Sequence, residues 1–288
     1  MKHLMKRALL GAALLAMTAC QASAPGEFDY IHLVNNTTGF VASDADTAIA
    51  IGLKKDSSLK AGIDAYLNTL DASAWGNLMS QMVALSADDS NATFNTGPLN
   101  NATDNGTFKI GMECAYKPYN WTQNNNANGA VPIQGEPGSY ANGYDVQIAR
   151  QVANALGMKL EIYRYDWDGL LPGVQSGAID GIIAGMSPTE ERLKEIDFSA
   201  VYYRSNLVVI GRKGSDLLKC KTLSELDQEG FKIAAQPGTF HLDALKAQTK
   251  NVTVVENLEE FADMQIALEA GTIDGYVAEE PTALTFCK

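Results

Sequence analysis

Residues 177–184 read GAIDGIIA and residues 271–278 read GTIDGYVA, two copies of one pattern in a single chain. Each copy follows an amphipathic helical stretch and contains the short apolar run of a buried strand. This repetition predicts two lobes built on one plan. Because ligands of open α/β sheets bind beyond the carboxyl ends of the strands, residues 185–192 and 279–280, just past the copies, are the first candidates for a functional site.

Strands and helices alternate throughout the region that follows residue 107. Apolar runs predict strands at 108–112, 158–164, 179–184, 205–211, 231–235, 251–255 and 273–278. Helical spacing predicts helices at 144–156, 167–176, 188–195, 222–228, 239–248, 258–270 and 280–286. Gly157, Gly177 and Gly271 stand where helices should end. The alternation predicts an α/β fold with parallel sheets covered by helices on both faces.

The first 106 residues divide by composition. Residues 28–34 and 47–53 are predicted strands, and 58–70 and 74–85 are predicted helices. Residues 87–106 (ADDSNATFNTGPLNNATDNG) are rich in Asn, Asp, Thr and Gly with almost no apolar content, which predicts a linker or a disordered connection.

The extreme N-terminus carries the features of an export signal. Basic residues precede the apolar run 8–17, which is too short to span a bilayer as a stable anchor. MTAC (17–20) looks like a bacterial lipobox, so we expect a lipid on Cys20 that holds the mature protein outside the cytoplasmic membrane. The alternative is ordinary cleavage after Ala19 or Ala22, with a free thiol at position 20.

Composition excludes several classes of protein. The chain has 288 residues, 46% hydrophobic and 19% charged, which excludes wholly disordered and collagen-like chains. A formal net charge of −12 argues against nucleic-acid binding. Apart from Cys20, the cysteines are Cys114, Cys220 and Cys287, without metal-ligand spacing, so we expect no zinc site and no cofactor. An oxidising compartment would permit a disulfide between Cys220 and Cys287.

The segment SPTE (187–190) has the form of a helix start. Ser187 can cap the helix, Pro188 fits the first helical position, and Glu190 completes a capping box. Arg192 follows about one turn later, and a guanidinium can bind a carboxylate through two parallel hydrogen bonds. The simpler alternative is a capped helix that carries a surface arginine.

Three further residues could complete a site for a zwitterion. Glu279 follows the second copy of the repeat and could accept hydrogen bonds from an ammonium group, or it could be an ordinary first-turn acid before Pro281. Gly238 and Thr239 stand at another helix start and could add a hydroxyl and a backbone N–H to the carboxylate site. Arg192 and Glu279, facing each other across a cleft, would recognise both charges of an α-amino acid.

Three residues at strand ends could contact a side chain of the ligand. Tyr116 and Trp167 lie at equivalent strand ends and could sandwich an aliphatic or cationic group, or simply belong to the core. Glu113 would be costly to bury without a cation. It could therefore bind the side chain of a lysine or arginine ligand, or pair with Lys117.

Five segments together resemble the polar amino-acid-binding proteins of bacterial ABC importers, the family 3 extracellular solute-binding proteins. They are FKIGMECAYKPYNW (108–121), GYDVQIARQVANALG (143–157), WDGLLPGVQSGAIDGIIAGMSPTEERLKEIDFS (167–199), AAQPGTFH (234–241) and GTIDGYVAEEP (271–281). Their order and spacing make the resemblance specific over most of 107–288. It implies a type 2 periplasmic-binding-protein fold, in which two lobes joined by hinge strands close over one free amino acid.

The resemblance also implies roles for single residues. Arg192, helped by Ser187, would clamp the α-carboxylate, and Glu279 would bind the α-ammonium group. The position of Glu113 is acidic in the family's binders of basic amino acids, which favours lysine or arginine. The implied ligand-binding residues are Glu113, Tyr116, Trp167, Gly185, Ser187, Arg192, Gly238, Thr239 and Glu279.

The order of segments departs from the family. Members begin near the strand at 108, whereas here 46–83 looks like the family's C-terminal end placed at the front, so we infer a circular permutation. The expected divisions are a signal peptide (1–19), a lipidated tether (20–27), one lobe from 48–86 and 107–213 with the hinge strands, a second lobe from 28–47 and 214–288, and a linker (87–106) that joins the ancestral termini. The alternative, a separate N-terminal domain before a truncated binding protein, would leave the second lobe one strand short.

The function expected from the sequence is that of a lipid-anchored receptor delivering one amino acid to the permease and ATPase subunits of an ABC importer. We expect no catalytic residue and no nucleic-acid partner. The alternative is an enzyme of the cyclic-acid dehydratase type on the same fold, with Glu113 and His241 as candidate acid or base. A sensory domain would need a transmembrane helix or signalling module. Lysine, arginine, ornithine, glutamine and histidine all stay open as ligands.

Overall fold

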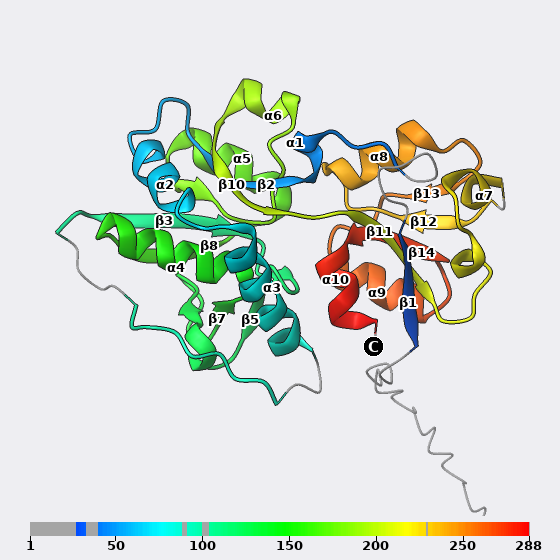
Figure 1. The fold of residues 1–288 in the computed structure, drawn as a ribbon, viewed down its shortest axis with the longest axis horizontal. Helices are drawn as coiled ribbons and strands as arrows, with labels where there is room; N and C mark the ends of the chain where they lie inside the picture. Colours follow the sequence, from blue (N-terminus) through cyan, green and yellow to red (C-terminus); the bar gives the residue numbers. More distant parts are fainter. Residues whose placement is uncertain (1–26, 33–39, 88–90, 100–103, 229, 288) are drawn as a thin grey trace, which may run out of the picture.

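The protein folds into two lobes that lie side by side (Figure 1). The computed structural model describes residues 27–32, 40–87, 91–99, 104–228 and 230–287. The expected signal peptide and Cys20 lie outside the described residues. None of the described helices is long and apolar enough to cross a membrane.

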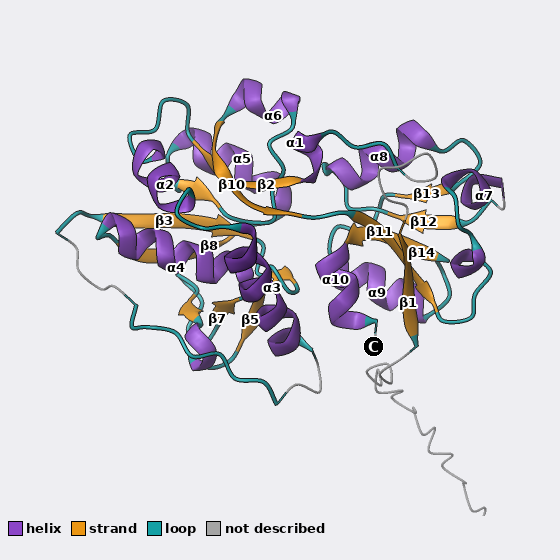
Figure 2. Ribbon diagram, viewed as in Figure 1, coloured by secondary structure: helices purple, strands orange, loops and turns teal. Residues whose placement is uncertain are grey.

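The first lobe is built on a five-stranded sheet in the order β10-β2-β9-β3-β8 (Figure 2). Its strands are β2 (Ala48–Leu53), β3 (Thr107–Met112), β8 (Lys159–Arg164), β9 (Gly181–Ile182) and β10 (Asp197–Arg204). Its helices are α2 (Lys60–Leu67), α4 (Tyr144–Leu156), α5 (Trp167–Ser176) and α6 (Glu190–Glu195). All six residues of β2 are buried, as their continuous apolar sequence requires of a strand covered on both faces.

The second lobe carries another five-stranded sheet, in the order β1-β11-β14-β12-β13. Its strands are β1 (Phe28–His32), β11 (Leu207–Arg212), β12 (Lys232–Ala234), β13 (Thr253–Val255) and β14 (Gly275–Glu279). Its helices are α7 (Leu223–Gln228), α8 (Phe240–Gln248), α9 (Phe261–Glu269) and α10 (Glu280–Phe286). The two copies of the repeat supply β9 and β14, one in each lobe.

Both sheets are mixed, whereas the sequence predicted parallel sheets. β3 is parallel to β8 and β9, and β12 is parallel to β13 and β14. The strands β2, β10, β1 and β11 pair antiparallel with their neighbours. The reason is that these strands do not come from βαβ units: they carry the chain from one lobe to the other. The chain crosses between the lobes a first time between β1 and β2, and a second time at Ser205 and Asn206, between β10 and β11.

The N-terminal part of the chain contributes to both lobes. β1 pairs with β11 in the second lobe, and β2 lies between β10 and β9 in the first. Between these strands is a one-turn helix, α1 (Asp44–Thr47). α3 (Ala72–Ser86) packs against α10 and α4, one helix from each lobe, and Ser86 Oγ lies 3.3 Å from Thr285 Oγ1. Residues 27–87 are therefore not a separate N-terminal domain.

Residues 91–99 of the expected linker form no helix or strand and contact the first lobe. Arg150 on α4 donates to the carbonyl oxygen of Gly97 at 2.6 Å, and Asn128 accepts from the backbone N–H of Phe94 at 3.0 Å. These two contacts fix the segment to the lobe even though its composition resembles that of a flexible chain.

A third, four-stranded sheet escaped the sequence analysis. Its strands β4 (Ala115–Tyr116), β5 (Asn120–Gln123), β6 (Val131–Pro132) and β7 (Tyr140–Asn142) are two to four residues long. Such strands lack a hydrophobic period that a sequence could reveal. The structure also keeps Cys114, Cys220 and Cys287 as free thiols, so the disulfide that the sequence permitted is not formed.

Candidate functional site

A cavity between the two lobes gathers the residues that the sequence selected. Its lining consists of Glu113, Tyr116, Trp167, Ala184, Gly185, Ser187, Arg192, Gln236, Thr239, Phe240, His241, Phe261 and Glu279. Every predicted site residue lies on this lining except Gly238, whose carbonyl oxygen accepts hydrogen bonds from two of them. The first lobe supplies Arg192 and the second supplies Glu279, as expected if each lobe binds one end of a ligand.

Arg192 connects the two sides of the cavity. Its Nη1 donates to the carbonyl oxygen of Ser187 at 2.9 Å, and its Nη2 donates across the cleft to the carbonyl oxygen of Gly238 at 3.0 Å. The guanidinium carbon lies 5.1 Å from the ring centre of Trp167, whose Nε1 also donates to Gly238 at 3.0 Å. Burial lowers the pKa of Arg192 to about 10, which leaves it charged at neutral pH.

The helix that carries Arg192 begins later than the sequence predicted. The N-cap of α6 is Thr189, whose hydroxyl accepts from the backbone N–H of Arg192 at 3.4 Å. The predicted capping box of Ser187 and Glu190 is therefore wrong. Ser187 lies three positions before the first residue of α6, and its Oγ instead donates to the carbonyl oxygen of Asp46 at 2.8 Å.

Glu279 ends β14 and is buried in the cavity wall. Its Oε1 lies 2.9 Å from Nε2 of His241, while its Oε2 has no hydrogen-bond partner among the described residues. Burial raises the pKa of Glu279 to about 8. Burial and, to a lesser extent, the charge of Arg192 lower the pKa of His241 to about 3. The contact is therefore a hydrogen bond that involves a neutral imidazole, and not an ion pair.

Glu113 is also buried, with 7% of its surface exposed. Its Oε1 accepts from Nε2 of Gln236 at 2.7 Å, and its Oε2 has no hydrogen-bond partner within the described part of the chain. Desolvation by burial raises the pKa of Glu113 to about 8, against a smaller opposing effect of the Gln236 hydrogen bond. A cation placed beside Oε2 would restore ionisation of this carboxyl group.

The aromatic residues of the cavity have two different surroundings. Tyr116 stacks on Phe261 of the opposite lobe, with ring centres 4.0 Å apart, and on Tyr119 at 5.0 Å. Trp167 lies under the guanidinium of Arg192. The sequence identified Tyr116 and Trp167, but it could not identify Phe261, because that residue opens α9 after a stretch without any recognised motif.

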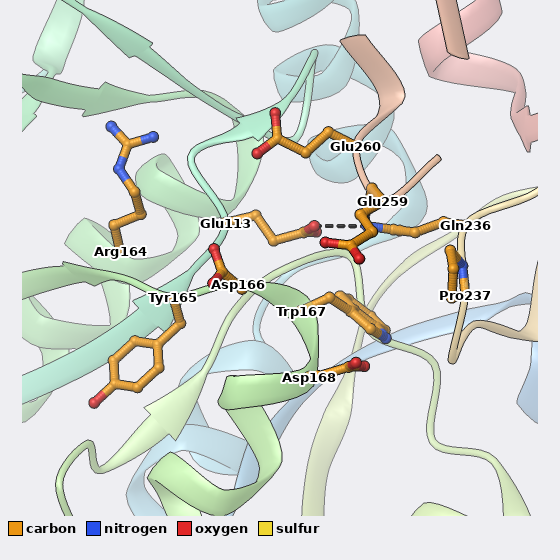
Figure 3. A pocket seen from close by; sticks show the side chains of 10 residues that line it. All are labelled: Glu113, Arg164, Tyr165, Asp166, Trp167, Asp168, Gln236, Pro237, Glu259 and Glu260. Atoms are coloured by element: carbon orange, nitrogen blue, oxygen red, sulfur yellow. Dashed lines mark hydrogen bonds between the residues drawn. The ribbon is translucent and has the colours of Figure 1, made fainter. Parts of the chain in front are cut away.

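An outer chamber adjoins the cavity and shares Glu113, Trp167 and Gln236 with it (Figure 3). Four more acids line it, namely Asp166, Asp168, Glu259 and Glu260. The only basic residue of its lining, Arg164, is paired with Glu136 at 2.7 Å. Clefts lined by one sign of charge concentrate ligands of the opposite sign, so this entrance favours cations.

Comparisons with known proteins agree with this geometry. The profile of the bacterial extracellular solute-binding proteins, family 3, matches residues 108–260. A "Probable histidine-binding protein" of Campylobacter jejuni is 33% identical over 196 residues, which cover 67% of this chain and 69% of that protein.

Two solved structures show the same fold. The arginine-bound form of a truncated ArgBP from T. maritima is 31% identical, with a TM-score of 0.52 over 64% of this chain and 78% of that chain. The ancestral amino acid-binding protein AncCDT-1, described as a precursor of cyclohexadienyl dehydratase, is 28% identical, with a TM-score of 0.52 over 62% of this chain and 71% of that one. Together with the sheet topology, these matches confirm the two-lobed α/β fold of periplasmic binding proteins.

Proposed function

The chain belongs to the bacterial extracellular solute-binding proteins of family 3, and from this membership we propose that it binds one free amino acid by closure of its lobes. The bound amino acid would be delivered to the permease and ATPase subunits of an ABC importer. Such a receptor does no bond chemistry, because binding and release complete its task.

The observation that carries this proposal is the placement of Arg192 and Glu279 on opposite lobes around one buried cavity. In the proposed complex, Arg192, Ser187 and Thr239 hold the α-carboxylate, and Glu279 accepts from the α-ammonium group. Gly185, Gly238, Tyr116 and Trp167 form the surrounding walls. Closure removes the zwitterion from water, so each of its charges needs a partner inside the cavity.

We propose a cationic amino acid, lysine or arginine, as the ligand. Glu113 supports this choice, because its unpartnered Oε2 is a buried acceptor at the junction of the cavity and the acidic outer chamber. A guanidinium or ammonium group at the end of the ligand's side chain would reach this acceptor from within the cleft. The likeness to an arginine-bound structure points the same way.

We propose that the N-terminus attaches the receptor to the membrane. A lipid on Cys20 would hold the receptor outside the cytoplasmic membrane, close to its permease, with 20–27 as the tether. The resemblance of MTAC (17–20) to a lipobox supports this placement.

We also propose that the chain is circularly permuted. The pairing of β1 with β11 and of β2 with β10 is what a displaced C-terminal end would give. The family profile begins at residue 108, although residues 27–87 are part of both lobes. α10 packs against β1, so these two elements, far apart in the sequence, are neighbours in the second lobe, as the permutation requires (Figure 1). The expected divisions at 47/48 and 213/214 belong to this proposal.

A thermal-shift screen against the twenty standard amino acids tests the function. A micromolar ligand at millimolar concentration stabilises a protein by about 4 kcal/mol, so binders stand out clearly. We expect the largest shift with L-arginine or L-lysine. Arg192→Ala should weaken binding by about 3 kcal/mol or more, since the ligand's carboxylate would be buried without its partner.

The matched control for that variant is Arg204→Ala, which removes an exposed arginine of the same lobe and should bind like the wild type. If Arg192→Ala bound the amino acid with the same affinity as the wild type, Arg192 would not be a ligand-binding residue. An absence of any shift with all twenty amino acids would contradict the receptor function itself.

The alternative activity is a dehydratase acting on a cyclic acid. The likeness to AncCDT-1 and the buried carboxyl groups of Glu113 and Glu279 favour it, because a protonated carboxyl group can act as a general acid. Analysis of the ligand after incubation with the protein distinguishes the two functions, because a receptor returns its ligand unchanged, whereas an enzyme converts it.

A further inference from the structure

Glu279 has a buried neighbour whose role the sequence did not reveal. His241 is the second residue of α8, whose N-cap is Thr239, and has 6% of its surface exposed. Its Nε2 lies 2.9 Å from Oε1 of Glu279, and its ring lies edge-on to Phe261 at 6.0 Å. An imidazole in the cavity wall has a functional role only if its hydrogen bond affects how the ligand is bound.

The contact is confined to one lobe. α8 and β14 pack against each other, so opening or closing the cleft need not make or break it. Glu279 therefore reaches the ligand with one oxygen already occupied by His241 and the other, Oε2, unpartnered. A carboxyl group held in this way needs no rotation of its side chain when an ammonium group arrives and displaces its proton.

We propose that His241 is a positioning residue for the α-ammonium group: its Nε2–H donates to Oε1 of Glu279 and keeps Oε2 directed at the ligand. This proposal rests on the amino-acid-binding function proposed above, and it specifies which residue orients the ammonium acceptor. His241 itself need not touch the ligand.

The tautomer of His241 follows from the ligand's charge. An ionised Glu279 facing an ammonium group can only accept hydrogen bonds, so Nε2 must carry the proton in the complex. Nδ1 has no hydrogen-bond partner among the described residues, so nothing on the far side of the ring opposes this tautomer. The charged or titratable groups that act on the pair are Arg192, which disfavours imidazolium, and Glu113, which disfavours a second carboxylate.

Two substitutions and two ligands test the proposal. His241→Leu removes the donor, whereas His241→Gln retains an N–H at a similar reach. The ligands are L-arginine and 5-guanidinopentanoic acid, which is arginine without its α-amino group; L-lysine and 6-aminohexanoic acid are the corresponding pair should lysine bind more tightly. Affinities are measured by titration calorimetry on residues 21–288, the chain without the expected signal peptide and the expected lipidated Cys20.

We expect His241→Leu to weaken amino-acid binding about tenfold or more, as loss of a hydrogen bond to a charged group does. It should change the affinity for the analogue without the α-amino group less than about threefold, and His241→Gln should stay within about threefold of the wild type for both ligands. Equal weakening of both ligands by His241→Leu would reduce His241 to a packing residue and overturn the proposal. Equal loss in His241→Gln and His241→Leu would also overturn it.

A spectroscopic measurement keeps the test valid if His241→Leu does not fold. In the wild type labelled with ¹⁵N-histidine, His241 should show a protonated Nε2 and a bare Nδ1 when the amino acid is bound, with His32 of β1 as the internal reference. A protonated Nδ1 in the complex would overturn the proposal. A wild type that binds none of the amino acids would defeat the proposed function, whereas normal binding with unchanged affinity in both variants would defeat only the role of His241.

Discussion

Replacing Glu113 by glutamine should have opposite effects on stability and on binding. Glutamine keeps the size of the side chain and can still accept the 2.7 Å hydrogen bond from Gln236 through its oxygen. It removes the charge, and it places an amide group where Oε2 of Glu113 now lies without a partner. The substitution therefore isolates the carboxylate from the packing around it.

The stability effect follows from the pKa of Glu113, which burial raises from 4.5 to about 8. Between these two values the folded chain binds this proton more tightly than the unfolded chain, so the free energy of unfolding decreases as the pH rises. At pH 7 the loss amounts to about 3 kcal/mol, because each pH unit above the unfolded pKa adds about 1.4 kcal/mol. Glu113→Gln should recover most of this loss at pH 7 and almost none of it at pH 4.

The binding effect has the opposite sign. A hydrogen bond to a charged group contributes about 1.5–3 kcal/mol, so Glu113→Gln should weaken L-arginine or L-lysine roughly 10- to 100-fold. L-Glutamine, which lacks a cationic side chain, should lose less than about threefold by the same reasoning.

Urea denaturation without ligand at pH 4 and pH 7, combined with calorimetry for the three amino acids, measures both effects. Glu259→Gln is the matched control, because it makes the same charge change at an exposed position of the same outer chamber. Wild-type affinity for arginine and lysine in Glu113→Gln would refute the assignment of Glu113 to the ligand's side chain. Unfolding free energies equal to the wild type at both pH values would refute the cost of burying it.

Two further predictions follow from the cavity and from the chain order. Because the pKa values of Glu113 and Glu279 lie at about 8 in the empty cleft, and a neighbouring cation lowers them, affinity for L-arginine should rise from pH 5.5 to 8 and then level off. Calorimetry in buffers of different ionisation enthalpy should detect release of about two protons with L-arginine and about one with L-glutamine, and proton uptake would contradict this. A reordered chain, 104–288 followed by 28–87 through a short Gly-Ser linker, should fold and bind within about threefold of the original if the permutation is correct. A reordered chain that folds but does not bind would contradict the proposed order.

The sequence was most informative where local chemistry and tertiary structure require the same residues. Gly157 and Gly177 end α4 and α5 with positive φ angles of 65° and 79°, so the predicted stops agree with the structure. The repeated GxIDG pattern located β9 and β14, and the cavity contains Glu279 from the end of β14 and Arg192 from α6, the helix that follows β9. Both successes come from short-range rules that tertiary contacts reinforce.

The sequence was uninformative where the structure or role of a residue depends on a contact with a residue distant in the chain. The sequence offered His241 only as a candidate acid or base, and its contact with Glu279, 38 positions away, became visible only in the structure. Ser187 had all the features of an N-cap, yet its hydroxyl is engaged by Asp46, 141 positions away. β10 was not predicted, because its exposed and buried residues alternate irregularly and its pairing with β2 contains two register shifts.

The charges of the residues that line the cavity bear on which class of amino acid the protein would bind. Among the cavity's lining residues, one permanent cation, Arg192, faces two carboxyl groups, those of Glu113 and Glu279. In the proposed complex, an α-carboxylate would neutralise Arg192 and an α-ammonium group would neutralise Glu279, which would leave Glu113 to a third charge on the ligand. A neutral side chain would leave Glu113 protonated, and an anionic side chain would add a repulsive charge to a site already rich in acids. If the proposed assignments hold, an amino acid with a positively charged side chain also ionises and pairs Glu113, so the affinity series should run from arginine or lysine through glutamine to glutamate.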